Sequence, residues 1–217
     1  MNFPALNLNI ANTLLQNSYM KMFTDISGSK GTGLAKAEHD KSLSSLTAKS
    51  AAAKQTFTSI SSSGKKINEL YSNVKKTGNE TALTGFKNYL KTSASDFGAA
   101  PLNNFANLGE AAFKKKDSGF FTTMLSDYQK LNDSKKSSLG KGMVDEAGAT
   151  FSNSGLSSAK KFVSTADYML NSKESKKDGL AVRGSDVLGG FMSKWKEIRT
   201  SGMKDEEKEV KFNELSE

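Results

Sequence analysis

Residues 43–74 read LSSLTAKSAAAKQTFTSISSSGKKINELYSNV, and this stretch decides the fold. Its apolar or small residues recur at alternating steps of three and four, which is the spacing of a heptad repeat. The members of this repeat are Leu43, Leu46, Ser50, Ala53, Phe57, Ile60, Gly64, Ile67, Tyr71 and Val74. Such spacing predicts a long helix with one seam that packs against a neighbour. The bulky members form the predicted interaction seam: Leu43, Leu46, Phe57, Ile60, Ile67, Tyr71 and Val74.

The predicted helix is long for a chain of 217 residues. From about residue 34 to residue 76 it would extend about 65 Å at 1.5 Å per residue. A compact globule of this chain length has a diameter of roughly 45 Å. The sequence therefore predicts either an elongated molecule or a bent helix, and Ser-Ser-Ser-Gly at residues 61–64 is the expected place for a bend.

A second apolar stripe precedes this helix and predicts an amphipathic amino-terminal helix. Its members are Leu14, Leu15, Tyr19, Met22, Phe23 and Ile26. The stretch GSKGTG at residues 28–33 follows, and its three glycines predict a flexible joint. Residues 1–77 would then form a long helical hairpin or a coiled-coil-like region.

After residue 78 the apolar stripes become shorter and are separated by Gly or by Ser, Asn and Asp, which supply caps and turns. Six such segments are present, at residues 83–97, 102–113, 120–131, 139–151, 156–170 and 187–198. We expect a compact bundle or array of about six short helices over residues 78–202. The charged tail at residues 203–217 is expected to fray. The apolar patterns of segments 118–131 and 185–198 are alike. The two segments are either degenerate repeats, or they share only the pattern that all amphipathic helices have.

The composition agrees with an all-α fold. The chain has two prolines, Pro4 and Pro101, and it is rich in Ala, Leu, Lys and Ser rather than in alternating β-branched residues. Thirteen Phe, five Tyr and eight Met supply the bulky apolar groups that a folded core needs. We therefore predict an all-α protein with an amino-terminal amphipathic helix, a long heptad-patterned helix and a helical bundle or array.

Several classes of protein are disfavoured by what the sequence lacks. The chain has no cysteine, so it forms no disulfide and holds no thiolate metal site. No stretch reaches the roughly 20 apolar residues of a membrane span, and the first 30 residues lack the pattern of a cleaved signal peptide. We expect a protein that is not integral to a membrane and is either cytoplasmic or exported without a cleaved signal peptide.

The sequence offers no marked catalytic constellation. His39 is the single histidine, and one histidine without cysteine disfavours a metal site. Catalysis through His39 would also need a positioned nucleophile, and the sequence marks none. The glycines of residues 28–33 lack the Lys and the hydroxyl that a phosphate-binding loop requires after its last glycine. Adjacent acids such as Asp145 and Glu146 point in different directions on a helix and have lysines nearby, so ion pairs are the expected role. We expect no enzyme activity, cofactor or metal.

Lysine dominates the basic charge. The net charge is +8, from 31 basic and 23 acidic residues, and only Arg183 and Arg199 are arginines. Lysine solvates a helix surface, whereas specific readers of nucleic acid depend more on arginine. Most lysine clusters have acids close in sequence, which favours a mixed surface. The candidate contacts for a polyanion are Lys65, Lys66, Lys75, Lys76, Lys114, Lys115 and Lys116.

Residues 8–13, LNIANT, resemble the Asn-x-Ala-Asn element near the amino terminus of flagellar rod and hook proteins. The tyrosine-containing continuation of that element is missing, so no family is assigned from it. Two hypotheses follow from the sequence as a whole. The first is a non-catalytic helical assembly or interaction protein, in an exported appendage or a virion, that binds a protein partner or itself. The second is a basic packaging protein that binds nucleic acid.

Overall fold

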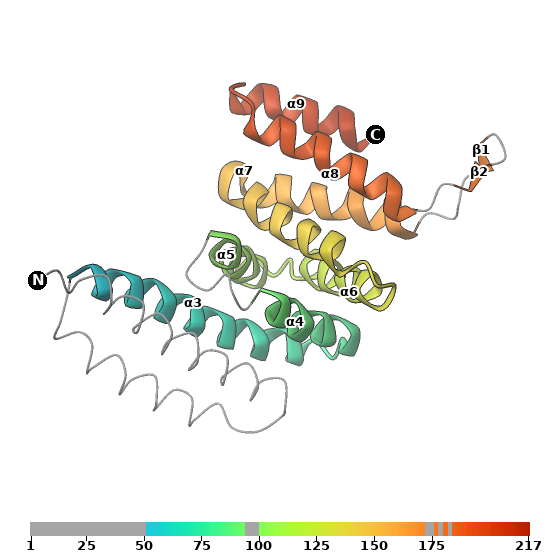
Figure 1. Ribbon diagram of the computed structural model, residues 1–217. Coiled ribbons are helices and arrows are strands. Elements are labelled where there is room, and N and C mark those ends of the chain that lie inside the picture. Colours follow the sequence, from blue (N-terminus) through green and yellow to red (C-terminus); the bar gives the residue numbers. More distant parts are fainter. Residues whose placement is uncertain (1–50, 94–99, 172–175, 178–179, 182–183) are drawn as a thin grey trace, which may run out of the picture.

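The computed structural model describes residues 51–93, 100–171, 176–177, 180–181 and 184–217, and it describes side chains at residues 64–93, 100–171, 184–185 and 187–217. This part of the chain is helical apart from one pair of very short strands (Figure 1). The helices are α3 (Ala51–Lys76), α4 (Glu80–Thr92), α5 (Ala100–Lys114), α6 (Gly119–Asp133), α7 (Ser137–Asn171), α8 (Gly184–Thr200) and α9 (Asp205–Ser216). The all-α fold class is thus confirmed for the described residues.

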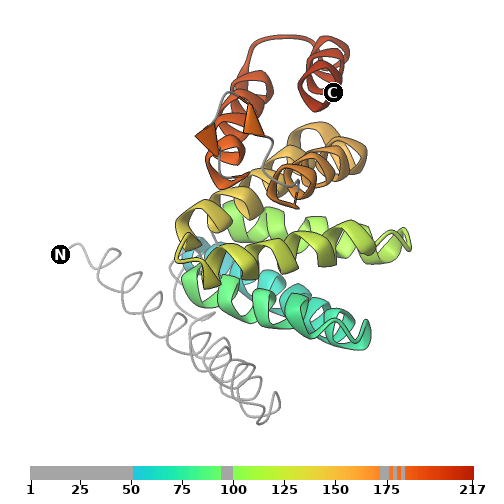
Figure 2. The same ribbon diagram turned by 90° about the vertical axis from the view of Figure 1, so that its right-hand side faces the viewer.

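The helices stack roughly in chain order, from α3 and α4 at one end to α9 at the other (Figures 1 and 2). Helix α7 lies in the middle and packs against α5, α6, α8 and α9, whereas α3 packs against α4 and α5. One continuous hydrophobic core runs through this stack, from Ile67 of α3 to Phe212 of α9. The proposed division into domains at residues 77 and 202 stays a prediction.

Helix α3 runs through residues 61–64 without interruption. Its 26 residues correspond to about 39 Å at 1.5 Å per residue. The described helix therefore has no break at the place where a bend was expected as the alternative to an elongated molecule. The amino-terminal amphipathic helix, the joint at residues 28–33 and the first part of the predicted long helix lie outside the described residues.

Local signals explain where α4 begins and how closely it packs. The side chain of Asn79 caps the helix, since its Oδ1 accepts a hydrogen bond of 2.9 Å from the amide of Ala82. Further along, Gly85 faces the backbone of α6, and any Cβ there would overlap the carbonyl oxygen of Leu125. A glycine at residue 85 thus lets α4 and α6 approach at backbone distance.

Two groups of aromatic rings form the centre of the core. The first joins α4, α5 and α6 through Phe86, Tyr89, Phe105, Phe121 and Tyr128. The second joins α7, α8 and α9 through Phe162, Phe191, Trp195 and Phe212. Such large rings bury much apolar surface per residue, which offsets the low hydrophobic fraction of 36%.

Helix α7 consists of two helical segments that turn at Gly155. This residue has φ 82° and ψ −176°, a conformation that is essentially restricted to glycine. The first segment packs along α5 and α6, and the second lies beside α8 (Figure 2). The two predicted segments at residues 139–151 and 156–170 are thereby confirmed as separate helical pieces.

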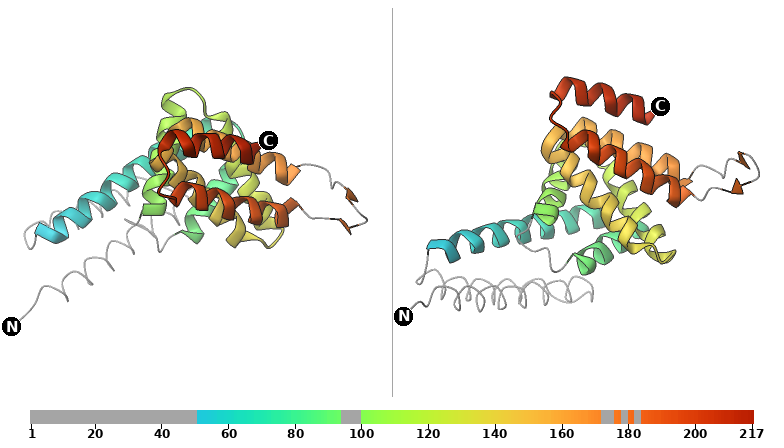
Figure 3. Two further views of the ribbon diagram at one scale, coloured as in Figure 1. Left: turned by 90° about the horizontal axis from the view of Figure 1, so that it is seen from above. Right: turned by 45° about the horizontal axis from the view of Figure 1, so that its top comes forward.

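The charged carboxyl-terminal segment is helical, so the prediction that it frays is wrong. Phe212 is buried between neighbouring helices, while most other residues of α9 are charged and exposed. Figure 3 shows α9 as the outermost helix, lying beside α8. A terminal helix with a polar outer face is the usual way in which a stacked array ends.

The strands are two residues each, β1 (Lys176–Lys177) and β2 (Leu180–Ala181), and they pair antiparallel. They lie beyond the ends of α7 and α8 (Figures 1 and 3). A pair this short does not alter the fold class.

Candidate interaction surfaces

The described end of the predicted seam lies inside the core. Ile67 and Val74 have no exposed surface, and Tyr71 is partly buried. Helix α3 packs there against α4 and α5, so these residues contact helices of the same chain. The other seam residues lie beyond the described side chains, and their part in an interaction stays a prediction: Leu43, Leu46, Phe57 and Ile60.

Two of the predicted lysine clusters meet at one carboxylate. Glu110 of α5 forms an ion pair of 2.5 Å with Lys114 and another of 2.9 Å with Lys66 of α3. The hydrogen bond from Lys114, and then that from Lys66, holds the pKa of the Glu110 carboxyl below its ordinary value. Lys66 also donates to Asn107 at 2.7 Å. These contacts hold α3 against α5 beside a shallow pocket of about 280 Å³.

Another lysine forms an ion pair just after the end of α5. Lys160 of α7 pairs with Asp117, just after α5, at 2.7 Å. The remaining candidate lysines are exposed, and no ion pair within the described part of the chain involves them: Lys65, Lys75, Lys76, Lys115 and Lys116. The surface around Glu110 and Asp117 is therefore basic but partly neutralised by its own acids.

Several lysines also lie at the carboxyl ends of helices. Lys75 and Lys76 end α3 and Lys114 ends α5, so their charge complements the unpaired carbonyls there. Lys116 follows with φ 57°, and the amides of residues 116 and 117 bond back to the carbonyls of residues 113 and 112. This is a Schellman cap with lysine at the position that glycine usually occupies. Helix capping is thus one physical role of the lysine clusters.

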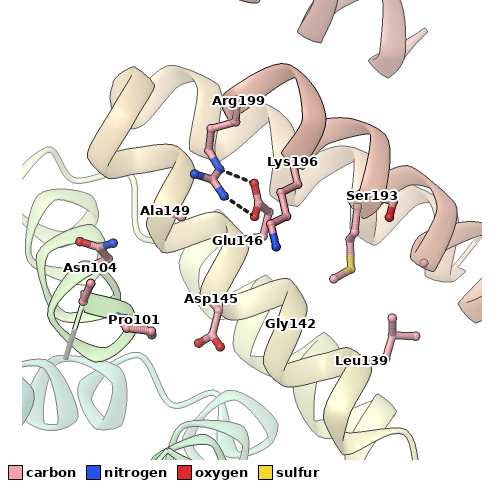
Figure 4. A pocket seen from close by; sticks show the side chains of 13 residues that line it. Pro101, Asn104, Leu139, Gly142, Asp145, Glu146, Ala149, Ser193, Lys196 and Arg199 are labelled. Carbon is pink, nitrogen blue, oxygen red and sulfur yellow. Dashed lines mark hydrogen bonds and ion pairs between the residues drawn. The ribbon is translucent and has the colours of Figure 1, made fainter. Parts of the chain in front are cut away.

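An open cleft of about 520 Å³ lies between α5, α7 and α8 (Figure 4). The start of α5 contributes Pro101 and Asn104. The remaining lining comes from α7 and α8, and much of it is apolar or small: Leu139, Gly142, Ala149, Gly189, Met192 and Ser193.

Three of the four charged residues that line this cleft, Asp145, Glu146 and Arg199, form ion pairs. Arg199 of α8 donates two hydrogen bonds to Glu146 of α7, at 2.6 and 2.9 Å, and both side chains are largely buried. Asp145 accepts hydrogen bonds from Tyr89 at 2.8 Å and from Lys141 at 2.6 Å. The expected ion pair with a nearby lysine is confirmed for Asp145. For Glu146 the expectation of a solvated pair with a lysine is wrong, because its partner is Arg199, 53 residues away, in a largely buried contact.

The cleft can therefore recognise a ligand by shape and apolar contact more readily than it can activate a reacting group. Lys196 is the charged lining residue that remains exposed. Sequence analysis did not predict this site, because its three walls come from segments that are separate along the chain.

Comparison with known proteins gives no match to a family model, to a curated protein or to a solved structure. None of the helices in the described ranges is both long and apolar enough to cross a membrane. Groups of three or more potential metal ligands are likewise missing from those ranges. The function has to be argued from the geometry of the surfaces.

Proposed function

We propose that this protein is a non-catalytic α-helical interaction protein that binds a protein partner or copies of itself within a larger assembly, such as an exported appendage or a virion. The observation that carries the proposal is the cleft between α5, α7 and α8. Asp145, Glu146 and Arg199 are held in ion pairs, and the apolar lining would be available to a partner.

The walls of the cleft are supported by contacts that keep its shape. Arg199 ties α8 to α7 through Glu146, and Trp195 donates to Thr150 at 3.0 Å between the same helices. On the other side, Gly148 of α7 lets the helix approach the backbone of α5 near Phe105. A preformed surface loses little conformational entropy when it binds, which favours association.

Two neighbouring glycines of α8 give a matched test. Gly189 lines the cleft and Gly190 does not, and a Cβ at either position would meet no atom within 4 Å. Gly189→Gln should therefore fill the cleft without disturbing the core, and Gly190→Gln should add the same side chain outside it. Both variants gain helix propensity to a similar extent.

Sedimentation velocity over a wide concentration range, at low and high salt, tests self-association. We expect the wild type and Gly190→Gln to associate, and Gly189→Gln to associate more weakly. For a different partner, a photo-crosslinking residue at position 189 should form adducts in the cells that make the protein, and one at position 190 should not. A compact monomer at every concentration, together with equal adducts from both positions, would contradict the proposal.

Polyanion binding is a second candidate, favoured by one specific observation. Lysines from α3 and α5 meet at Glu110, and Lys160 of α7 pairs with Asp117, seven residues further along the chain. Counterion release would make such binding strongly dependent on salt. The double variant Lys115→Gln/Lys116→Gln should then lower the slope of log affinity for duplex DNA against log salt by about two. The same change at Lys204 and Lys208, near the start of α9, is the control, and equal slopes in all three proteins would exclude this surface.

A further inference from the structure

A buried carboxylate lies at the contact between α6 and α7. Asp127 of α6 is 1% exposed. Its Oδ1 forms an ion pair with Nζ of Lys130 on the same helix, at 2.9 Å. Its Oδ2 has no hydrogen-bond donor among the described residues. A buried carboxylate oxygen without a donor is costly, so this atom requires an explanation.

The neighbour that explains it is a second carboxyl group. Asp167, near the end of α7, is within hydrogen-bonding reach of Asp127. Two ionised carboxylates are both acceptors, so a hydrogen bond between them requires that one of them carries a proton. With that proton, the buried oxygen of Asp127 gains the partner that it otherwise lacks.

Other side chains complete a connection between the two helices. Asn171 of α7 donates to Asp167 at 2.5 Å, and its Oδ1 accepts from Lys130 at 3.0 Å. Lys130 and Asn171 therefore bridge α6 and α7 beside the carboxyl pair. The charged groups that act on Asp127 are Lys130 from its own helix and Asp167 from the helix packed against it.

We propose that Asp127 and Asp167 share one proton in mildly acidic solution, and that release of this proton as the pH rises weakens the contact between α6 and the last turns of α7. The protein would then carry a pH-sensitive connection in its core. This inference is independent of what binds in the cleft.

The electrostatics agree with the geometry. Burial raises the pKa of Asp127 from 3.8 to about 6, Lys130 opposes this, and the negative charge of Asp167 adds to it. Because the pKa is higher in the folded protein, the proton stabilises the fold fully below pH 4, and this stabilisation is lost as the pH rises through 6. The difference between 3.8 and about 6 corresponds to a change of about 100-fold in the folding equilibrium.

Asp127→Asn supplies a permanent donor in place of the shared proton. We expect its unfolding equilibrium constant, measured with urea, to equal that of the wild type near pH 4 and to be up to about 100-fold smaller at pH 7.5. Asp133→Asn on the same helix is the control, because Asp133 is exposed and bonds to Gln129. A difference between Asp127→Asn and the wild type that does not change with pH would overturn the proposal.

A direct measurement covers the case in which the variant does not fold. The side-chain carboxyl carbons of the wild type, labelled with ¹³C, report each titration by NMR. We expect the Asp127 signal to titrate near pH 6. A midpoint for Asp127 at or below the ordinary aspartate value would show that no proton is shared.

Discussion

Phe212→Ala should detach α9 while the rest of the array stays folded. The Phe212 ring is buried and stacks on Trp195, with 4.0 Å between the ring centroids and an interplanar angle of 14°. It is the only residue of α9 that is fully buried. Beyond it, α9 is held by the partly buried Leu215 and by a hydrogen bond from Lys161 to Asn213.

The magnitude follows from the apolar area that Phe212 buries. A buried phenylalanine removes about 150–200 Å² from water, which is worth about 4 kcal/mol at 25 cal/mol/Å², and the stacked ring pair adds about 1 kcal/mol. A helix of 12 residues is at best marginally stable in water without such contacts. Truncation should therefore release α9, and the global loss of stability is limited to the free energy that α9 contributes by docking.

Trp195 provides the assay, since it is the single tryptophan of the chain and is fully buried. In Phe212→Ala we expect its emission to shift to longer wavelength and α9 to become sensitive to protease, with most of the helical circular dichroism retained. Val210→Ala is the control, because Val210 lies on the same helix with 54% of its surface exposed. An unchanged emission spectrum in Phe212→Ala would refute the reasoning.

Three further predictions concern stability measured by urea unfolding. Gly155→Ala should cost about 1–3 kcal/mol, because φ 82° with ψ −176° is strained for any other residue. Lys116→Gly and Lys135→Gly should each stabilise by roughly 0.5–1 kcal/mol, since both lysines have φ near +57°; a loss of stability would show that the lysine side chains make compensating contacts. Arg199→Met should cost about 3 kcal/mol, because it leaves the buried Glu146 without its partner, and Glu146→Leu in the same chain should recover most of it. If the double variant is no better than Arg199→Met, the loss comes from packing rather than from charge.

The helices of the second half could be predicted because each has its own apolar stripe and its own terminator. Asn79 caps α4, and the Ser-Asn-Ser-Gly sequence at residues 152–155 separates the two segments of α7. These are local signals that act within one turn of the chain. The packing order of the helices depends on contacts far apart in sequence, so it could not be predicted in the same way.

The heptad pattern of α3 predicted the direction of its buried face but underestimated its width. Leu70 lies outside the 3-4 repeat, yet it is almost fully buried and approaches Gly109 of α5. A helix in a globular protein buries a face at least 100° wide, whereas a coiled-coil seam is narrower. Burial of Leu70 together with Ile67 and Val74 therefore indicates that this end of α3 packs as a globular helix.

The two segments that resemble each other, residues 118–131 and 185–198, occupy α6 and α8. Equivalent positions share burial in several cases: Phe121 and Leu188, Met124 and Phe191, and Tyr128 and Trp195 are all buried. Phe120 and Val187 differ, since Phe120 is buried and Val187 is 41% exposed. The apolar spacing alone places these residues on one face of each helix, so the likeness does not by itself demonstrate repetition.

The spacing of charged residues along the chain predicted the ion pairs within one helix but not those between helices. Glu110 has Lys114 one turn away, but its other partner, Lys66, comes from α3. Arg199 and Glu146 are 53 residues apart and form the buried pair of the cleft. Local pairing can be predicted from helical spacing, since residues i and i+4 face each other. Pairs between helices depend on the packing, so they could not be predicted from the spacing of charges along the chain.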